Sequence, residues 1–337
     1  MLSAISLSNG RSTVNLGFGC ASLLRLSSQA ERQRLLDLAV DLGITHFDVA
    51  HLYGLGAAEA ELGLLFRRNS GHLTVGTKFG LGNIGLTQAL QSRQSQGRQL
   101  LKRFPALRSL ARRVYGTQMV KRDYSSANCI ASLEASLKQM NLEYIDLFAI
   151  HEPETTDPID PTLESLLENL CQEGRIGAYG LSGNPLVLDR ILAQRPNLSG
   201  GILQWEDSIL DRAIARTDRR GNTIGLFGLV RCGLSTLQTA FQAVPQLKHF
   251  WSERLCCDLE RSEYLVAALL AHGLSLNPEG LVLYATTQPR RLKQTLSILR
   301  EPPWTSEQLR AFGDFWKTPD CNAHRSPTSS SGSHSPI

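Results

Sequence analysis

Short apolar runs recur along the whole chain and alternate with segments of a different period. Such runs predict buried β-strands, which we place at Val14–Gly19, Ile44–Ala50, Leu73–Phe79, Tyr144–His151, Arg175–Gly183, Gly200–Glu206, Thr223–Val230 and Gly280–Thr287. Because the runs are nearly continuously apolar, they are typical of strands that are buried on both faces, as in a parallel sheet covered by helices.

The segments between these runs carry apolar residues at the spacing of an amphipathic helix. The clearest predicted helices are Ala30–Leu42, Cys129–Met140, Pro161–Cys171, Pro185–Ala193 and Pro289–Leu299. The last three begin with proline, which suits the first turn of a helix. Eight strands that alternate with helices predict an α/β protein with the (β/α)8 architecture, a TIM barrel. A doubly wound open sheet is the alternative.

Two segments interrupt this alternation. Gly80–Asp123 is far longer than an ordinary connection, so we predict an insertion after the third strand. Its basic residues are Arg93, Arg98, Lys102, Arg103, Arg108, Arg112, Arg113, Lys121 and Arg122, and Asp123 is its first acid. They form either a solvated helix face or a surface that covers a cofactor or attracts an acidic substrate. Residues 318–337 are low in complexity and predicted to be disordered, which leaves residues 1–317 for the barrel.

Composition narrows the possible classes of protein. Of the 337 residues 42% are hydrophobic and 20% are charged, as in soluble globular proteins. The net charge of +4 is too small to suggest nucleic acid as a partner. The seven cysteines show neither a CxxC pair nor a zinc-ligand spacing, so we expect no metal, reduced thiols and a cytoplasmic location. No signal peptide or membrane span is expected either.

One segment matches the glycine pattern of a nucleotide-binding motif but lacks another residue that the motif requires. The stretch from Gly80 to Gly85 reads GLGNIG and matches GxGxxG after a predicted strand. A dinucleotide-binding Rossmann unit also requires an acidic residue about 20 positions later. That position falls at Leu100–Arg103, which carries no acid, so we interpret these glycines as part of a loop.

Polar side chains follow several of the predicted strands where each strand ends. Asp48 and Tyr53 follow the second strand, Lys78 the third and His151 the fourth, while Ser182 and Gln204 end the next two. In a parallel barrel all these ends lie on one face, where active sites form. The sequence therefore predicts that the six side chains share one face.

The first four side chains suit proton transfer to a carbonyl oxygen. A tyrosine has a pKa of about 10, which a nearby lysine cation lowers. An aspartate keeps that lysine charged, and a histidine holds the substrate oxygen. Each residue also has a structural interpretation, because Asp48 can cap a turn, Lys78 can pair with any acid, His151 can be a buried histidine and Tyr53 can cover the core.

The motifs around these residues resemble those of the aldo-keto reductases. FDVAHLYG, VGTKFG and YIDLFAIHEP carry the resemblance, and LGFGCASL and EGRIGAYGLSG extend it over about Val14 to Arg300. The resemblance implies a TIM barrel that holds NADPH or NADH across the carboxyl ends of its strands. It also implies that Tyr53 is the general acid, that Lys78 and Asp48 tune it, and that His151 orients the carbonyl.

The same resemblance implies a set of cofactor contacts. Ser182 and Gln204 match the residues that hold the nicotinamide carboxamide, and Phe227 matches the aromatic residue that stacks on the ring. The family's asparagine position is taken by Gly183, with Asn184 one residue later. In ATTQPRRLKQT the contacts to the adenosine 2′-phosphate fall on Thr286, Thr287 and Arg291, so NADP(H) is favoured over NAD(H).

We therefore expect an oxidoreductase that interconverts an aldehyde or ketone and its alcohol, with a small carbonyl compound or sugar as substrate. Trp205 and Glu206 are expected to shape the substrate side, and the insertion and Gly233–Leu259 to supply pocket walls. The alternative is a non-catalytic, nucleotide-binding barrel that regulates a partner protein. Binding of RNA or of a membrane surface through the basic insertion is disfavoured, because the only aromatic residues among its basic residues are Phe104 and Tyr115. The oligomeric state is left open.

Overall fold

The computed structural model describes residues 2–69, 71–83, 120–210, 214 and 221–316, and these form a closed barrel of eight parallel strands. The strands are β3 (Leu16–Gly19), β4 (His46–Asp48), β5 (Thr74–Phe79), β8 (Ile145–His151), β9 (Ile176–Gly183), β10 (Gly201–Glu206), β11 (Thr223–Phe227) and β12 (Leu281–Tyr284). They follow one another around the barrel in chain order, and β12 closes it against β3. The predicted TIM barrel is confirmed.

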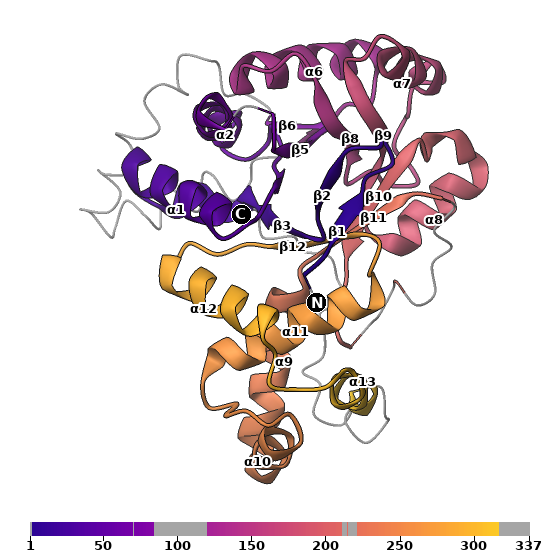
Figure 1. Ribbon diagram of the computed structural model, residues 1–337. Helices are drawn as coiled ribbons and strands as arrows, with labels where there is room; N and C mark the ends of the chain where they lie inside the picture. Colours follow the sequence, from indigo (N-terminus) through magenta and orange to yellow (C-terminus); the bar gives the residue numbers. More distant parts are fainter. Residues whose placement is uncertain (1, 70, 84–119, 211–213, 215–220, 317–337) are drawn as a thin grey trace, which may run out of the picture.

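Helices surround the barrel (Figure 1). They are α1 (Gln29–Asp41), α2 (Ala57–Arg68), α6 (Ser126–Met140), α7 (Leu163–Gln172), α8 (Pro185–Gln194), α9 (Leu229–Ala243), α11 (Ser262–Leu276) and α12 (Pro289–Arg300). The additional helices α10 (Pro245–Arg254) and α13 (Ser306–Phe315) pack near α9 and α11. The helix predicted from Cys129 begins earlier, because the hydroxyl of Ser125 accepts a hydrogen bond from the backbone N–H of Asn128 and caps α6.

Three predicted strands end earlier than the apolar pattern suggests, and the one predicted to reach Ala50 ends at Asp48. The strand predicted to reach Val230 ends at Phe227, because Gly228 turns the chain with a φ of 79° and α9 begins at the next residue. The last strand ends at Tyr284, so the threonines after it lie in the turn before α12.

The segment Gly233–Leu259, expected to supply a pocket wall as a loop, is mostly helical. It comprises most of α9 and all of α10. Leu237, Phe241 and Trp251 are buried in the core, and Trp251 packs edge-on against Phe312 of α13. Apolar residues at helical spacing therefore pack this segment against other helices, and the expectation of a loop was wrong.

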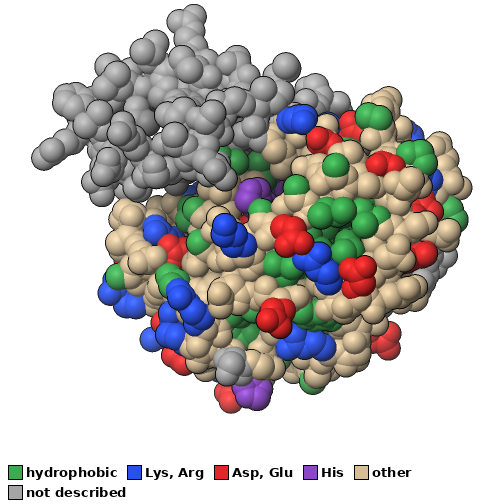
Figure 2. Space-filling model, turned by 90° about the horizontal axis from the view of Figure 1, so that it is seen from above, with side chains coloured by type: hydrophobic (Ala, Val, Ile, Leu, Met, Phe, Trp, Pro, Cys, Tyr) green, Lys and Arg blue, Asp and Glu red, His purple; other side chains and the backbone are tan. Residues whose placement is uncertain are grey.

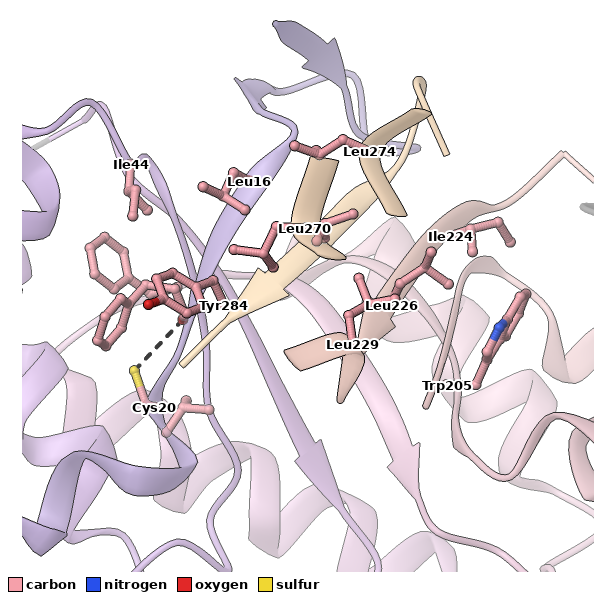
Figure 3. Packing of buried hydrophobic residues seen from close by; sticks show 14 of the residues in the cluster. Leu16, Cys20, Ile44, Trp205, Ile224, Leu226, Leu229, Leu270, Leu274 and Tyr284 are labelled. Carbon is pink, nitrogen blue, oxygen red and sulfur yellow. Dashed lines mark hydrogen bonds between the residues drawn. The ribbon is translucent and has the colours of Figure 1, made fainter. Parts of the chain in front are cut away.

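The main apolar core lies between the barrel and the helices, and part of it is shown in Figure 3. Trp205 is buried in this core, while its neighbour Gln204 points into the barrel. Successive residues of a strand face opposite sides, so Trp205 faces the helices. It therefore does not shape the substrate side, contrary to expectation.

A hairpin covers the amino ends of the barrel strands. It consists of β1 (Ala4–Ser6) and β2 (Ser12–Val14), which takes up the first residue of the strand predicted at Val14–Gly19. Ile5 and Leu7 pack against residues at the start of the strands, among them Leu147 and Ile202. This end of the barrel is closed by apolar side chains, so the site must lie at the opposite, carboxyl end.

The two ends of the predicted insertion lie side by side. β6 (Leu81–Asn83) pairs antiparallel with β7 (Val120–Arg122). Residues 84–119 and 317–337 lie outside the described residues, and with them most of the basic set, Gly85 and the predicted disordered tail.

On the face shown in Figure 2, basic and acidic side chains are mixed. In the part of the chain that is described, no helix has the length and apolar character to cross a membrane.

Candidate active site

The four predicted catalytic side chains come from three adjacent strands. Asp48 ends β4, Lys78 is the fifth residue of β5, and His151 ends β8. Tyr53 lies in the turn that follows β4. Because β4, β5 and β8 are neighbours in the barrel, the structure brings these residues together at its carboxyl end.

Lys78 and Asp48 form a buried ion pair. Nζ of Lys78 lies 2.6 Å from Oδ1 of Asp48 and donates a second hydrogen bond to the carbonyl of Val49 at 3.1 Å. The two side chains are only 4% and 11% exposed. Burial opposes the charge of Lys78, but the charge and hydrogen bond of Asp48, together with Tyr53 and Cys20, outweigh burial and raise the pKa of the lysine. Lys78 is therefore an ammonium at neutral pH.

Tyr53 lies beside this cation. Nζ of Lys78 is 5.8 Å from the centre of the phenol ring. Burial raises the pKa of Tyr53 and outweighs the lowering effect of Lys78, so the net direction is upward. Lys78 lowers the pKa of Tyr53, as expected from the sequence, but burial raises this pKa by more. In this state Tyr53 is a protonated phenol at neutral pH, the form that a proton donor requires.

His151 faces Tyr53. The centres of the two rings are 6.2 Å apart, and the ring planes are nearly perpendicular at 83°. Burial, aided by the cations of Lys78 and Arg122, lowers the pKa of His151 to about 3. The imidazole is therefore neutral at neutral pH, and it can exchange a hydrogen bond with an oxygen without adding charge.

Two predicted nicotinamide contacts lie directly beside these residues. Ser182 is buried and pairs in register with His151 across β8 and β9. Nε2 of Gln204 donates a hydrogen bond to Oδ2 of Asp48 at 2.9 Å, so both carboxylate oxygens of Asp48 have partners. No pattern in the sequence predicts this bond. Phe227 is half-buried at the end of β11.

The predicted adenosine-side residues follow β12. Thr286 is buried and its hydroxyl accepts a hydrogen bond from the N–H of Gln288, while Thr287 is half-buried. Arg291 lies in the first turn of α12, whose N-terminus has no side-chain cap. Backbone N–H groups and an arginine at a helix start suit an anionic group such as a phosphate.

Asn184 has a structural task instead. Its side-chain oxygen accepts a hydrogen bond from the N–H of Leu186 at 3.0 Å and so caps α8. The shift by one residue from the family's asparagine position therefore places this side chain at a helix start.

A small cavity lies in the barrel beneath the ion pair. It measures about 10 Å³, room for about one water molecule, and its lining includes Asp48, Lys78, Gln204 and His46. His46 was not singled out in the sequence analysis. It lies two residues before Asp48 on the same strand, so strand alternation would have placed both side chains on the inner face. Burial lowers the pKa of His46 to about 4, which leaves the ring neutral.

Comparison with known proteins identifies the family of the chain. The profile described as "Aldo/keto reductase family" matches residues 15–196, more than half of the chain. The chain belongs to the aldo/keto reductase family. It is an NAD(P)-dependent oxidoreductase that acts on the carbonyl–alcohol couple. An uncharacterised oxidoreductase, YqkF of Bacillus subtilis, is 25% identical over 92% of this chain and 95% of its own length. D-threo-aldose 1-dehydrogenase of Pseudomonas sp. is 31% identical, over 49% of each chain.

Solved structures support the fold. The holo form of the aldo-keto reductase AKR11C1 from Bacillus halodurans superposes with a TM-score of 0.69 at 20% identity, covering 94% of this chain and 97% of that one. The glycerol dehydrogenase AKR11B4 from Gluconobacter oxydans gives 0.70 at 18% identity, covering 93% and 94%. At this identity the likeness concerns the barrel and not the substrate.

Proposed function

We propose that the protein interconverts an aldehyde or ketone and its alcohol, with Tyr53 as the general acid in reduction and the general base in oxidation. The observation that carries this proposal is the buried Lys78–Asp48 ion pair beside the Tyr53 ring, with the ring of the neutral His151 also next to the phenol. A lysine held charged beside a phenol favours proton loss from that phenol, because it stabilises the phenolate that remains.

In the reductive direction, the substrate oxygen accepts hydrogen bonds from Tyr53 and His151. As the carbonyl carbon receives a hydride, negative charge develops on this oxygen and the phenol proton moves to it. The phenolate of Tyr53 is stabilised by Lys78, which Asp48 keeps charged, and it regains its proton from water. In the oxidative direction the phenolate removes the alcohol proton, the electrons of the O–H bond form the carbonyl double bond, and the electron pair of the C–H bond leaves with the hydrogen as hydride.

The nicotinamide cofactor supplies or accepts the hydride, and the residues present fit its binding. The hydroxyl of Ser182 and the amide of Gln204 are buried polar groups beside the ion pair, suited to a carboxamide, and Phe227 offers a ring for stacking. Thr286, Thr287 and Arg291 would hold the adenosine phosphate. The uncapped start of α12 together with Arg291 favours NADP(H) over NAD(H).

The substrate we propose is a small carbonyl compound or a sugar. Two relatives support this class by name, D-threo-aldose 1-dehydrogenase of Pseudomonas sp. and L-glyceraldehyde 3-phosphate reductase of Escherichia coli K12. Both match this chain over about half of its length or less, and the chain spans less than half the length of each of these relatives. Their names therefore support a class of substrate and no single compound.

The decisive experiment replaces Tyr53 by phenylalanine, which removes only the hydroxyl whose proton is transferred. Tyr53→Phe should lower turnover of a substrate by about 100-fold or more, the usual size of general acid catalysis, while NADPH still quenches protein fluorescence with an unchanged Kd. Tyr264→Phe is the matched control, since Tyr264 lies on α11 beside Arg261, and it should retain wild-type turnover.

A Tyr53→Phe enzyme with wild-type turnover would remove Tyr53 from the mechanism. A wild-type protein that binds NADPH or NADH but turns over none of a panel of aldehydes, ketones and sugars, in either direction, would favour the non-catalytic regulatory alternative.

A further inference from the structure

The turn that carries Tyr53 has an unfavourable backbone. Gly54, Leu55 and Gly56 follow one another with φ angles of 67°, 56° and 86°. The left-handed region suits glycine, but it is unfavourable for leucine, whose Cβ approaches the backbone. Such a conformation persists only where surrounding contacts hold it. The question is which contacts hold this turn.

Glu59 is a fixed anchor next to the turn. Its side chain is 0% exposed and lies in the first turn of α2, where the helix dipole favours a carboxylate. Oε1 accepts hydrogen bonds from the hydroxyls of Thr77 at 2.9 Å and Ser136 at 2.6 Å. Thr77 precedes Lys78 on β5, so Glu59 is tied to the strand that carries the catalytic lysine.

The other carboxylate oxygen faces His51. Nδ1 of His51 is 2.9 Å from Oε2 of Glu59. The ring also packs over Gly56, because a Cβ at that position would lie 3.1 Å from Cε1 of His51. The N–H of Gly56 donates to the carbonyl of His51 at 2.8 Å. His51 therefore holds the start and the end of the turn through its side chain and its backbone.

We propose that His51 is a positioning residue for Tyr53: paired with the buried carboxylate of Glu59, it holds the turn so that the phenol stays beside Lys78 and His151. The proposal rests on the proposed role of Tyr53 as the proton donor. His51 does not touch substrate or cofactor, and it acts only through the turn.

The pairing of His51 with Glu59 should make the positioning of Tyr53 depend on pH. Glu59 on α2 is the charged group that faces His51, and α6 contributes the uncharged Gln139 near Gly56. The hydrogen bond to Glu59 raises the pKa of His51 above about 6.5, although burial opposes it. The ion pair is complete below a pH of about 6.5 and is lost as the pH rises through the raised value. Since burial raises the pKa of Tyr53 above about 10, kcat for carbonyl reduction, in which Tyr53 is the acid, should fall in two separate alkaline steps.

Two variants separate hydrogen bonding from titration. His51→Ala removes the donor and should lower kcat at pH 7 by about 10-fold, because small displacements of a reacting group are costly, with the KM for NADPH changed less than about twofold. His51→Asn places a neutral amide N–H near the position of Nδ1, so its kcat should match that of wild type above the first alkaline step, and this step should be absent. His249→Asn is the control, since His249 is 78% exposed, and it should keep both steps.

Hydrogen exchange of the peptide that covers residues 50–58 reports on the turn without reference to catalysis. Exchange should be faster in His51→Ala than in wild type and close to wild type in His51→Asn at pH 7. Wild-type kcat and exchange in His51→Ala, or a first alkaline step that persists in His51→Asn, would overturn the proposal. If Tyr53→Phe retains turnover but His51→Ala still loosens the turn, the role of Tyr53 is refuted and the holding of the turn by His51 is not.

Discussion

Burial acts on the pKa of three proposed active-site groups, His151, Tyr53 and Lys78. It lowers the pKa of His151 to about 3 and raises the pKa of Tyr53, so one is neutral and the other protonated at pH 7. Burial also opposes the charge of Lys78, but the carboxylate of Asp48 at 2.6 Å favours it. A single buried ion pair therefore supplies the charge on which the proposed mechanism depends.

At this scale the residue types were predictable and their partners were not. Asp48, Tyr53, Lys78 and His151 follow from polar residues at the ends of apolar runs. The bond from Gln204 to Asp48, by contrast, joins residues 156 positions apart, and the pair of His51 with Glu59 depends on a turn that no local pattern specifies.

Arg291 provides a test of cofactor preference. If its guanidinium binds the 2′-phosphate, Arg291→Ala should weaken NADPH binding by about 10-fold or more, the size of a lost hydrogen bond to a charged group, and leave NADH binding nearly unchanged. Fluorescence titration with both cofactors measures this difference. Arg290→Ala, an exposed neighbour, is the control. Equal losses for NADPH and NADH would show that Arg291 does not distinguish them.

Among the elements, the amino-terminal hairpin makes several polar contacts with the barrel, and one group of them centres on Asp146. Asp146 of β8 is buried, and its carboxylate accepts hydrogen bonds from Arg11 at 2.9 Å, from Asn9 at 3.2 Å and from the N–H of Val75 at 2.8 Å. Arg11 also donates to the carbonyl of Leu73 at 3.1 Å. The hairpin is therefore fixed to two neighbouring strands at the closed end of the barrel.

Loss of this contact should destabilise the fold without touching the active site. Arg11→Met removes the cation beside a buried carboxylate, so we expect the free energy of unfolding in urea to fall by about 2 kcal/mol, with kcat unchanged. Arg68→Met breaks an exposed ion pair with Asp37 and should cost less than about 1 kcal/mol. Equal effects of the two substitutions would indicate that the hairpin contact adds no more than a surface pair.

The strand and helix assignments succeeded where the pattern was local. The five helices predicted from periodicity are observed within three residues of their expected ends, whereas Thr223–Val230 was too long because Gly228 ends the strand within an apolar run. The segment Gly233–Leu259 was predicted to be a loop but is mostly helical, and Leu234, Leu237 and Phe241 have helical spacing. The element ends depend on caps and turns, which short apolar patterns do not encode.

For the whole molecule, the predicted insertion leaves and returns at one place. Asn83 and Val120 are partners in the antiparallel pair of β6 and β7. The chain can therefore be divided into a barrel and residues 84–119, whose flanking residues are joined by the pairing of β6 with β7.

This division predicts that residues 84–119 are dispensable for folding. Replacing them by Asn-Gly, a pair suited to a two-residue hairpin turn, should leave a monodisperse protein with the far-ultraviolet circular dichroism of a TIM barrel and intact NADPH binding. Aggregation of the shortened chain, with loss of cooperative thermal unfolding, would refute the division between barrel and insertion. A loss of turnover alone would instead connect the segment with the substrate.

The sequence by itself determined the class of fold and the chemical groups available to the site. Both follow from short-range patterns: apolar runs become strands buried in a barrel, and polar residues after them must emerge at its carboxyl end. The tertiary structure decided which groups meet, because Asp48 contacts Lys78 and Gln204 only after the barrel has closed. It also decided the pKa directions, since burial and charge act through space between residues that are distant in the chain.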